Sequence, residues 1–346
     1  MSQVGDRRLL ARGLGRPVAG FALWLALAAT GTVAQTAPGA SAGSSTPPSL
    51  NQWLDRLQDA SRRRAYIGTF VVSAGSTMSA SKIWHVCDGT QQMERIDSLT
   101  GTARTTLRKN DEVLTLVPES RVAWAEKREA LRPFPDQINT PGNAIEEHYT
   151  LRLLGVERVA GFEADVLHIQ PRDALRFGYR VWSEKQTGLT VKMQTLDGQG
   201  QVIEQMVFSE LQLDAPVKME TLSKLMAKTQ GYKILRPQLT KTTAEAQGWR
   251  LRQAVPGFQA MSSHTRGDPA APAGTLPMQW VFSDGLSSVS LFVEPFDAQR
   301  HRREGASALG ATHSLTVRLG QHWLTAMGEV PPATLREFAQ SLERLR

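Results

Sequence analysis

The amino-acid sequence predicts a mostly β protein of the α+β class, with one large antiparallel sheet and a second, smaller β unit. The first observation is that short β-forming segments alternate with turn residues from 66 to about 213. The second is that the same pattern returns from residue 249 onward. The third is that apolar residues at helical spacing form short stretches that flank these regions. Many antiparallel strands in succession predict a strongly curved sheet or barrel.

The first 34 residues have the layout of a bacterial export signal. Arginines at 7, 8, 12 and 16 precede an apolar run at 18–29, and small residues follow at 32–34. The apolar run is too short to span a hydrocarbon core of ~30 Å comfortably. We therefore expect residues 1–34 to be removed and the protein to work in the periplasm, with a retained membrane anchor as the alternative. Residues 35–48 lack large apolar side chains, which predicts a flexible leader.

An amphipathic helix is predicted to begin directly after Ser49. Ser49 is a suitable N-cap, and Gln52 three residues later completes a capping box. Apolar residues recur at helical spacing at Leu50, Trp53, Leu54, Leu57 and Ala60. Such a helix can lie on a membrane surface, but its single apolar stripe favours packing on a sheet.

The first β unit is expected to contain ten strands. They are predicted at 67–73, 81–86, 112–118, 121–127, 149–153, 155–159, 164–171, 176–184, 189–196 and 201–211. Asp197-Gly198-Gln199-Gly200 is a strong hairpin signal between the last two. Leu189, Val191 and Met193 alternate with polar residues, which predicts a strand with one buried and one solvated face.

Residues 214–241 interrupt this pattern and are expected to form a basic linker with a helix near 219–228. The second unit has predicted strands at 249–255, 259–265, 278–283, 286–295, 314–319 and 322–327, with a hairpin turn at Asp284-Gly285. Pro331-Pro332 opens a terminal helix that carries Leu335, Phe338, Ala339, Leu342 and Leu345 on one face. The expected domains cover 49–213 and 242–346.

The sequence contains no local motif typical of catalysis or metal binding. Its seven histidines include no pair at metal-ligand spacing, and Cys87 is the single cysteine. The net charge is +7 for the full chain and +4 without residues 1–34, which carry four Arg and one Asp. This mild excess suits anionic lipid headgroups or an acidic protein segment and not nucleic acid. We therefore expect a non-catalytic protein without cofactor or metal. A secreted hydrolase remains an alternative, because catalytic side chains distant in sequence can converge in space.

A set of short stretches in a fixed order carries a family resemblance. They are Tyr66-Ile67-Gly68-Thr69-Phe70, His85 with Asp88-Gly89, Glu94-Arg95-Ile96, Leu99-Thr100-Gly101, Arg108-Lys109-Asn110-Asp111, Tyr179-Arg180-Val181-Trp182, Thr187-Gly188-Leu189 and Met327-Gly328-Glu329-Val330-Pro331-Pro332-Ala333-Thr334. The set extends over about residues 50–346 and resembles the MucB/RseB family, periplasmic negative regulators of the envelope-stress sigma factor.

The resemblance implies an N-terminal half-open β-barrel similar to lipoprotein carriers, followed by a smaller α/β domain. It also implies a partner, the periplasmic tail of a membrane-spanning anti-sigma factor, which such proteins bind and shield from proteolysis. Lipopolysaccharide or a mislocalised lipoprotein is the implied signal that releases the shield. A lipid or lipoprotein carrier without a signalling role is the alternative.

Two sets of candidate site residues follow from this reading. The first set is expected to line an apolar cavity for acyl chains, with ordinary core packing as the alternative: Phe70, Val72, Ile83, Val191 and Met193. The second set is expected to face a protein partner from the second unit: Arg318, His322 and Trp323. Trp323 can instead belong to the core.

Overall fold

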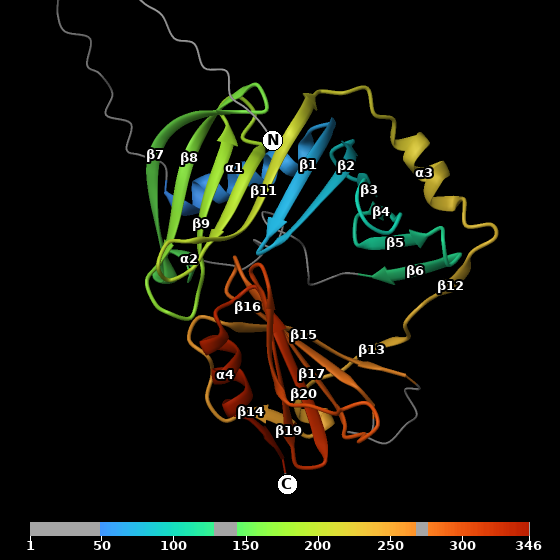
Figure 1. Ribbon diagram of the computed structural model, residues 1–346, viewed down its shortest axis with the longest axis vertical. Helices are drawn as coiled ribbons and strands as arrows, with labels where there is room; N and C mark the ends of the chain where they lie inside the picture. The colour runs from blue at the N-terminus through green and yellow to red at the C-terminus, as the bar shows by residue number, and fades with distance from the viewer. Residues whose placement is uncertain (1–48, 128–143, 268–275, 346) are drawn as a thin grey trace, which may run out of the picture. The chain divides into compact units, whose positions relative to one another are not determined.

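The computed structural model describes residues 49–127, 144–267 and 276–345 (Figure 1). The expected export signal and leader lie outside the described residues. The described chain forms a 12-stranded sheet, a 7-stranded sheet and a two-stranded sheet, with helices at their margins. The mostly β, α+β class is therefore confirmed.

The first sheet has the strand order β12-β6-β5-β4-β3-β2-β1-β11-β10-β9-β8-β7. Its strands are β1 (Tyr66–Ala74), β2 (Thr77–Cys87), β3 (Gln92–Ser98), β4 (Thr105–Lys109), β5 (Glu112–Val117), β6 (Val122–Lys127), β7 (Tyr149–Val159), β8 (Phe162–Pro171), β9 (Gly178–Glu184), β10 (Thr190–Leu196), β11 (Val202–Leu213) and β12 (Lys233–Leu235). Within the described residues the two end strands, β12 and β7, are not hydrogen-bonded to each other, so the sheet stays open.

Helix α1 (Leu50–Arg63) lies on one face of this sheet, which we call the inner face (Figure 1). Its capping box is formed as predicted: Gln52 N donates to Ser49 Oγ at 3.3 Å, and Ser49 N donates to Gln52 Oε1 at 2.8 Å. All five residues of the predicted apolar stripe are buried. The four larger ones pack with side chains of β7, β8 and β9, and Ala60 packs with side chains of β1, β2 and β11, which confirms that the helix packs on a sheet. The short helix α2 (Ala144–His148) precedes β7.

Strand β10 corrects the prediction of simple alternation. Its pairing with β9 shifts between Thr190 and Lys192, which is a β-bulge. Met193 therefore packs with the inner-face cluster, whereas Val191 is fully buried on the opposite face against Trp182. The strand is covered on both faces instead of being solvated on one.

Residues 214–241 are more than a linker. Helix α3 (Met219–Ala227) packs its buried Leu222 against Val86 and Met93, on the face opposite α1. Strand β12 then pairs in parallel with β6. This segment therefore covers part of the first sheet and extends its edge (Figure 1).

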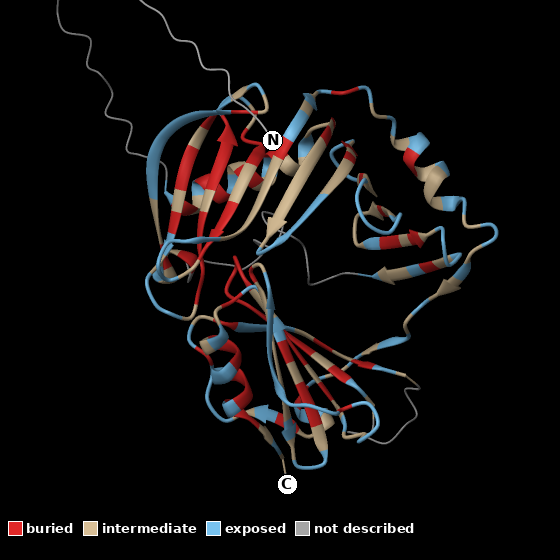
Figure 2. Cartoon of the chain, viewed as in Figure 1, coloured by how far each residue is buried: buried red, intermediate tan, exposed pale blue. Residues whose placement is uncertain are grey.

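The second sheet has the order β13-β15-β16-β17-β20-β19-β18. Its strands are β13 (Leu239–Lys241), β15 (Gln259–Arg266), β16 (Met278–Ser283), β17 (Ser288–Pro295), β18 (Gly305–Leu309), β19 (Thr312–Leu319) and β20 (His322–Gly328). A 3₁₀ turn, η1 (Glu245–Gln247), precedes β14 (Trp249–Leu251). Buried residues gather along this sheet and the facing side of α4 (Pro332–Ser341) (Figure 2).

The end of the chain differs from the prediction. Leu335, Phe338 and Ala339 are buried on α4 as expected, but the helix ends at Ser341. Leu342 instead begins strand β21 (Leu342–Arg344), which pairs with β14. Leu342 is still buried in the core of the second sheet, but from an extended strand and not from a helix. The strand is stable there because its pairing with β14 satisfies its backbone hydrogen-bonding groups.

Candidate functional site

The inner face of the first sheet carries an apolar pocket beside the C-terminal end of α1. The pocket has a volume of about 190 Å³. Its walls come from α1, β1, β2, β3, β4, β10 and β11 and the residue before β10: Ser61, Tyr66, Phe70, Ile83, His85, Gln92, Glu94, Ile96, Arg108, Leu189, Thr190, Met193, Met206 and Phe208. Drug-sized ligands occupy pockets of about 300–1,000 Å³, so this pocket is smaller than a typical site for a whole ligand of that size.

Aromatic rings form one wall of the pocket. Phe208 meets Tyr66 edge-on with ring centroids 6.3 Å apart, and Phe70 with centroids 5.9 Å apart. Gly68 permits this arrangement, because a Cβ atom there would lie 2.5 Å from Cε1 of Phe208. A glycine in this strand is therefore explained by close approach of a ring and not by a turn.

Polar groups also contribute to the lining of the pocket. Arg108 Nη1 donates to Glu94 Oε1 at 3.0 Å, across neighbouring strands β3 and β4. His85 Nδ1 donates to the carbonyl oxygen of Arg64 at 2.8 Å, and its ring stacks on Tyr66 with centroids 4.9 Å apart. The lining of the pocket therefore combines aromatic and aliphatic side chains with hydrogen-bonded polar groups.

The structure brings together three of the five cavity candidates. Phe70, Ile83 and Met193 line the pocket. Val72 is half-buried on β1 outside the lining, and Val191 packs on the opposite face of the sheet. Most of the remaining lining comes from β3, β4 and β11, where the sequence pattern marked no cavity residue.

The three partner candidates lie in different environments. Trp323 is buried and stacks on His301 with ring centroids 5.0 Å apart. His322 is half-buried and meets Trp249 edge-on. Arg318 is exposed, and its guanidinium lies 3.9 Å from the ring centroid of Phe296. Of the three, Arg318 alone is exposed.

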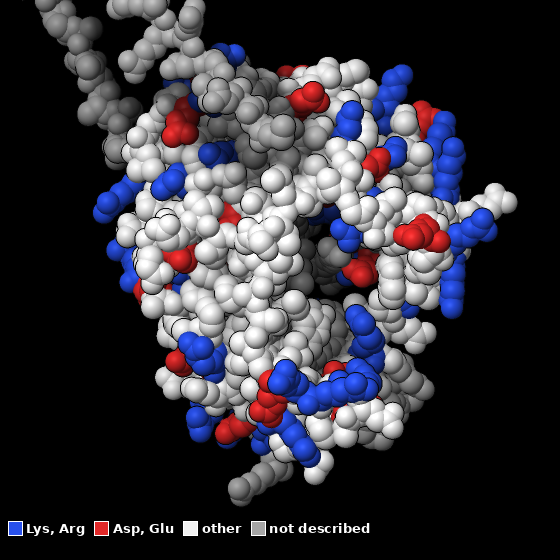
Figure 3. Space-filling model, in the orientation of Figure 1, with Lys and Arg blue, Asp and Glu red and all other residues white. Residues whose placement is uncertain are grey.

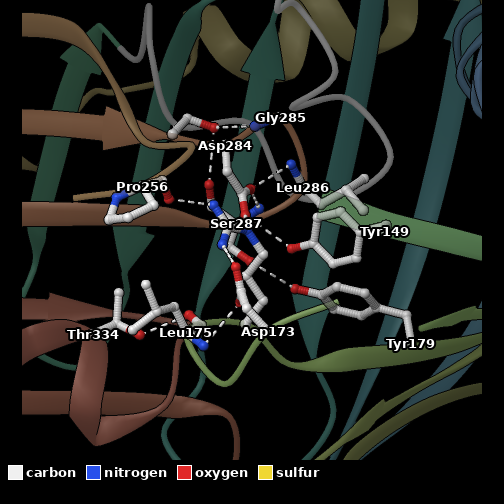
Figure 4. A network of polar contacts seen from close by, with 12 residues as sticks. Tyr149, Asp173, Leu175, Tyr179, Pro256, Asp284, Gly285, Leu286, Ser287 and Thr334 are labelled. Carbon is white, nitrogen blue, oxygen red and sulfur yellow. Dashed lines mark hydrogen bonds and ion pairs between the residues drawn. The ribbon is translucent and has the colours of Figure 1, made fainter. Parts of the chain in front are cut away.

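A second polar cluster joins the two sheets (Figure 4). Arg176, just before β9, donates from Nε to Oδ2 of Asp284, in the β16–β17 turn, at 2.8 Å, and both side chains are fully buried. The other guanidinium nitrogens donate to Asp173 Oδ2 at 2.5 Å and to the Pro256 carbonyl at 2.6 Å. Tyr149 Oη donates to Asp284 Oδ2 at 2.9 Å. We call this cluster the buried joint.

Local sequence explains the shape of the joint. Asp284-Gly285 forms the predicted hairpin turn, because Asp284 Oδ1 accepts hydrogen bonds from the amides of Leu286 and Ser287 at 2.9 and 2.7 Å. Burial raises the pKa of the Tyr149 phenol well above its ordinary value, and the Asp284 charge adds to this. Tyr149 is therefore a neutral hydrogen-bond donor to the carboxylate.

Beside the buried joint, each of the two sheet units also contributes an apolar side chain that packs against the other unit. Leu286, from the second sheet, is buried in the cluster that α1 forms with β7, β8 and β9. Leu175, from the loop before β9, packs against the core of the second sheet, and its carbonyl accepts a hydrogen bond from Thr334 Oγ1 at 2.6 Å. Each unit thus packs one leucine against the core of the other.

Two observations on the described residues concern metal and thiol chemistry. Within them, no group of three or more His, Cys, Asp or Glu side chains is arranged to hold a metal ion. Burial raises the pKa of the Cys87 thiol, which opposes formation of a nucleophilic thiolate. The helices of the described segments also lack the length and hydropathy that a membrane crossing requires. The two features that stand out in the described residues are the apolar pocket on the inner face and the buried joint.

Comparison with known proteins gives a consistent family. The MucB/RseB N-terminal domain model matches residues 49–226, and the MucB/RseB C-terminal domain model matches residues 243–343. The sigma factor AlgU regulatory protein MucB of Pseudomonas aeruginosa is 30% identical over 298 residues, covering 84% of this chain and 90% of the relative. The sigma-E factor regulatory protein RseB of Escherichia coli is 23% identical over 311 residues, covering 88% and 93%.

Solved structures agree with this match. The crystal structure of MucB in complex with MucA(peri) has a TM-score of 0.65 at 27% identity, covering 86% of this chain and 99% of that chain. The complex of Pseudomonas aeruginosa MucA and MucB has a TM-score of 0.63 at 27% identity, covering 85% and 98%. Because the two domain models and these full-length matches agree, the chain belongs to the MucB/RseB family.

Proposed function

We propose that this protein is a non-catalytic periplasmic regulator that binds the periplasmic segment of a membrane-spanning anti-sigma factor. The observation that supports this most directly is the likeness, along 86% of the chain, to MucB in the structure of its complex with MucA(peri). The curated relatives carry the names of regulatory proteins. The sequence features of an export signal at residues 1–34 support a periplasmic location.

Shielding and release form the second part of the proposal. The bound segment is protected from proteolysis, and a lipid or lipoprotein acyl chain lowers the affinity of the regulator for it. The apolar pocket beside α1 supports this part, because each buried CH₂ group contributes about 0.8 kcal/mol. Linkage requires that the two ligands weaken each other's binding by the same factor.

The experiment uses residues 35–346 and the periplasmic domain of Pseudomonas aeruginosa MucA as the probe. We expect a saturable complex by calorimetry and slower digestion of the probe by an added protease. Titration with lipopolysaccharide should weaken the complex and restore digestion. A probe that neither binds nor gains protection contradicts the regulator reading, and a complex insensitive to lipopolysaccharide and acylated peptide contradicts the release step.

Lipid or lipoprotein carriage without signalling is the second candidate, and the pocket is the observation that favours it. The same experiment separates the two functions. A carrier binds the acylated peptide and leaves the MucA probe unbound, whereas a regulator binds both and exchanges one for the other.

A further inference from the structure

Strand β18 is an open edge of the second sheet. It is the last strand in the order of that sheet and, among the described strands, pairs with β19 alone. All of its residues, Gly-Ala-Ser-Ala-Leu at 305–309, are exposed, and Leu309 is 60% exposed. None of them is charged or proline, and the described pairing with β19 has no bulge. Such a strand presents an unprotected row of backbone donors and acceptors.

The other ends of the two large sheets are protected. β7 carries a bulge between Leu153 and Gly155 and charged residues at 152, 157 and 158. β12 and β13 are only three residues long. Charge, bulges and short length are the usual means by which an edge avoids pairing with another chain. β18 lacks charge and bulge, which marks it as an edge that a partner can use.

The backbone groups that point away from β19 can be assigned from the turn. Gly310 has a φ of +58°, and with Ala311 it forms a two-residue turn that joins Leu309 to Thr312. The residues that close such a turn exchange both backbone hydrogen bonds, and the pattern then alternates along the strand. The N–H and C=O groups of Ala306 and Ala308 therefore face outward.

The surroundings of β18 indicate the chemistry of the partner. Exposed Arg302, Arg303 and Glu304 precede the strand, and exposed Arg318 lies on the neighbouring strand β19. Glu304 Oε1 already accepts a hydrogen bond from the Arg318 amide at 2.8 Å, so the three arginines leave a net positive charge here. Figure 3 shows basic side chains over the second sheet, with fewer acidic ones among them. At the other end of β18, a Cβ atom on Gly310 would lie 2.7 Å from Ala74 Cβ, so this end lies against β1 of the first sheet. A segment along β18 would thus run from a basic region towards the first sheet.

We propose that the edge of β18 receives an extended segment of the anti-sigma factor as an added strand, with acidic residues of that segment beside Arg302 and Arg303. This inference rests on the proposed function and names the surface at which the partner binds. Main-chain hydrogen bonds to Ala306 and Ala308 supply affinity, and the arginines select the charge of the incoming segment.

The test uses residues 35–346 and the Pseudomonas aeruginosa MucA periplasmic domain. Ala306→Pro removes an outward N–H, and proline is tolerated at an edge position whose N–H faces solvent. Ala306→Ser is the matched control, since it keeps the N–H. We expect Ala306→Pro to weaken binding about tenfold and Ala306→Ser to leave it within about twofold. In the unaltered protein, hydrogen exchange at Ala306 and Ala308 should slow when the probe binds.

Each result has a distinct meaning. A probe that binds without slowing exchange at Ala306 and Ala308 overturns the assignment of the edge and leaves the regulator function standing. Absence of any binding overturns both. Slower exchange that follows protein concentration and ignores the probe overturns the assignment in favour of pairing between copies of this chain.

Discussion

Arg176 and Asp284 form a fully buried ion pair at 2.8 Å between residues 108 positions apart, one in each sheet unit. Every nitrogen of the guanidinium has an oxygen acceptor, and Asp284 also accepts from Tyr149. A charge buried in this way is tolerated only when its partners are complete. Any other arrangement of the two units would leave these buried charges unpaired, so the pair is expected to favour this contact over alternatives.

Removal of one partner should be costly. We expect Asp284→Asn to lower the free energy of unfolding by about 3 kcal/mol, because it removes the fully buried one of the two carboxylates that compensate the Arg176 charge and leaves only the partly exposed Asp173. Asp59→Asn is the matched control, since Asp59 pairs with Arg63 on the exposed face of α1 at 3.3 Å. That substitution should cost about 0.5 kcal/mol or less in urea unfolding. If Asp284→Asn and Asp59→Asn lower the free energy of unfolding equally, the buried joint does not contribute to stability as described.

Gly257 tests the packing of the same joint. Its φ is +78°, and a Cβ atom there would overlap Arg176 Nη2 and His148 Nε2. Gly89 has a φ of +92°, but a Cβ atom there would meet no described atom within 4 Å, so Gly89→Ala carries the backbone strain alone. We expect Gly257→Ala to lower the unfolding free energy by about 1–3 kcal/mol more than Gly89→Ala. If thermal unfolding gives the same stability for Gly257→Ala and Gly89→Ala, position 257 is not packed tightly against Arg176 and His148.

The pocket on the inner face gives a prediction about ligand uptake. Met193→Phe places a larger, stiffer side chain in the lining, and we expect it to weaken binding of a fluorescent fatty acid about tenfold. Met78→Phe is the control, because Met78 is 72% exposed and outside the lining. Fluorescence titration measures both. Unchanged uptake by Met193→Phe, with the fold intact by circular dichroism, places the fatty acid elsewhere.

His168 predicts a pH dependence of stability. Burial lowers the pKa of its imidazole, and the charges of Arg180 and Arg152 on the neighbouring strands lower it further. Below the unfolded-state value of about 6.5 the unfolded chain therefore binds more protons than the folded chain, so stability falls as the pH falls. Above that value this histidine contributes no pH dependence.

The measurement compares unfolding at pH 7 and pH 5 for the unaltered protein and His168→Gln. The glutamine does not titrate, so we expect a smaller loss of stability on acidification in this variant. If His168→Gln loses as much stability between pH 7 and pH 5 as the unaltered protein, then groups other than His168 cause the whole pH dependence.

Local signals in the sequence predict α1 and most strands well. The Ser49–Gln52 capping box and the spacing of five apolar residues define α1 without help from distant residues. The same signals do not predict strands β3 and β4, because these strands carry charged residues on the inner face. Glu94 and Arg108 satisfy each other across the two strands, and this pairing cannot be read along the chain.

The sequence alone determined the class of the fold, the amphipathic first helix and the hairpin turn at Asp284-Gly285, because each depends on residues within a few positions of one another. Tertiary structure decided which residues share a pocket, since the bulge in β10 turns Val191 and Met193 to opposite faces. It also decided that Arg176 meets Asp284. Long-range contacts of this kind depend on how strands pair and units pack, which no local pattern records.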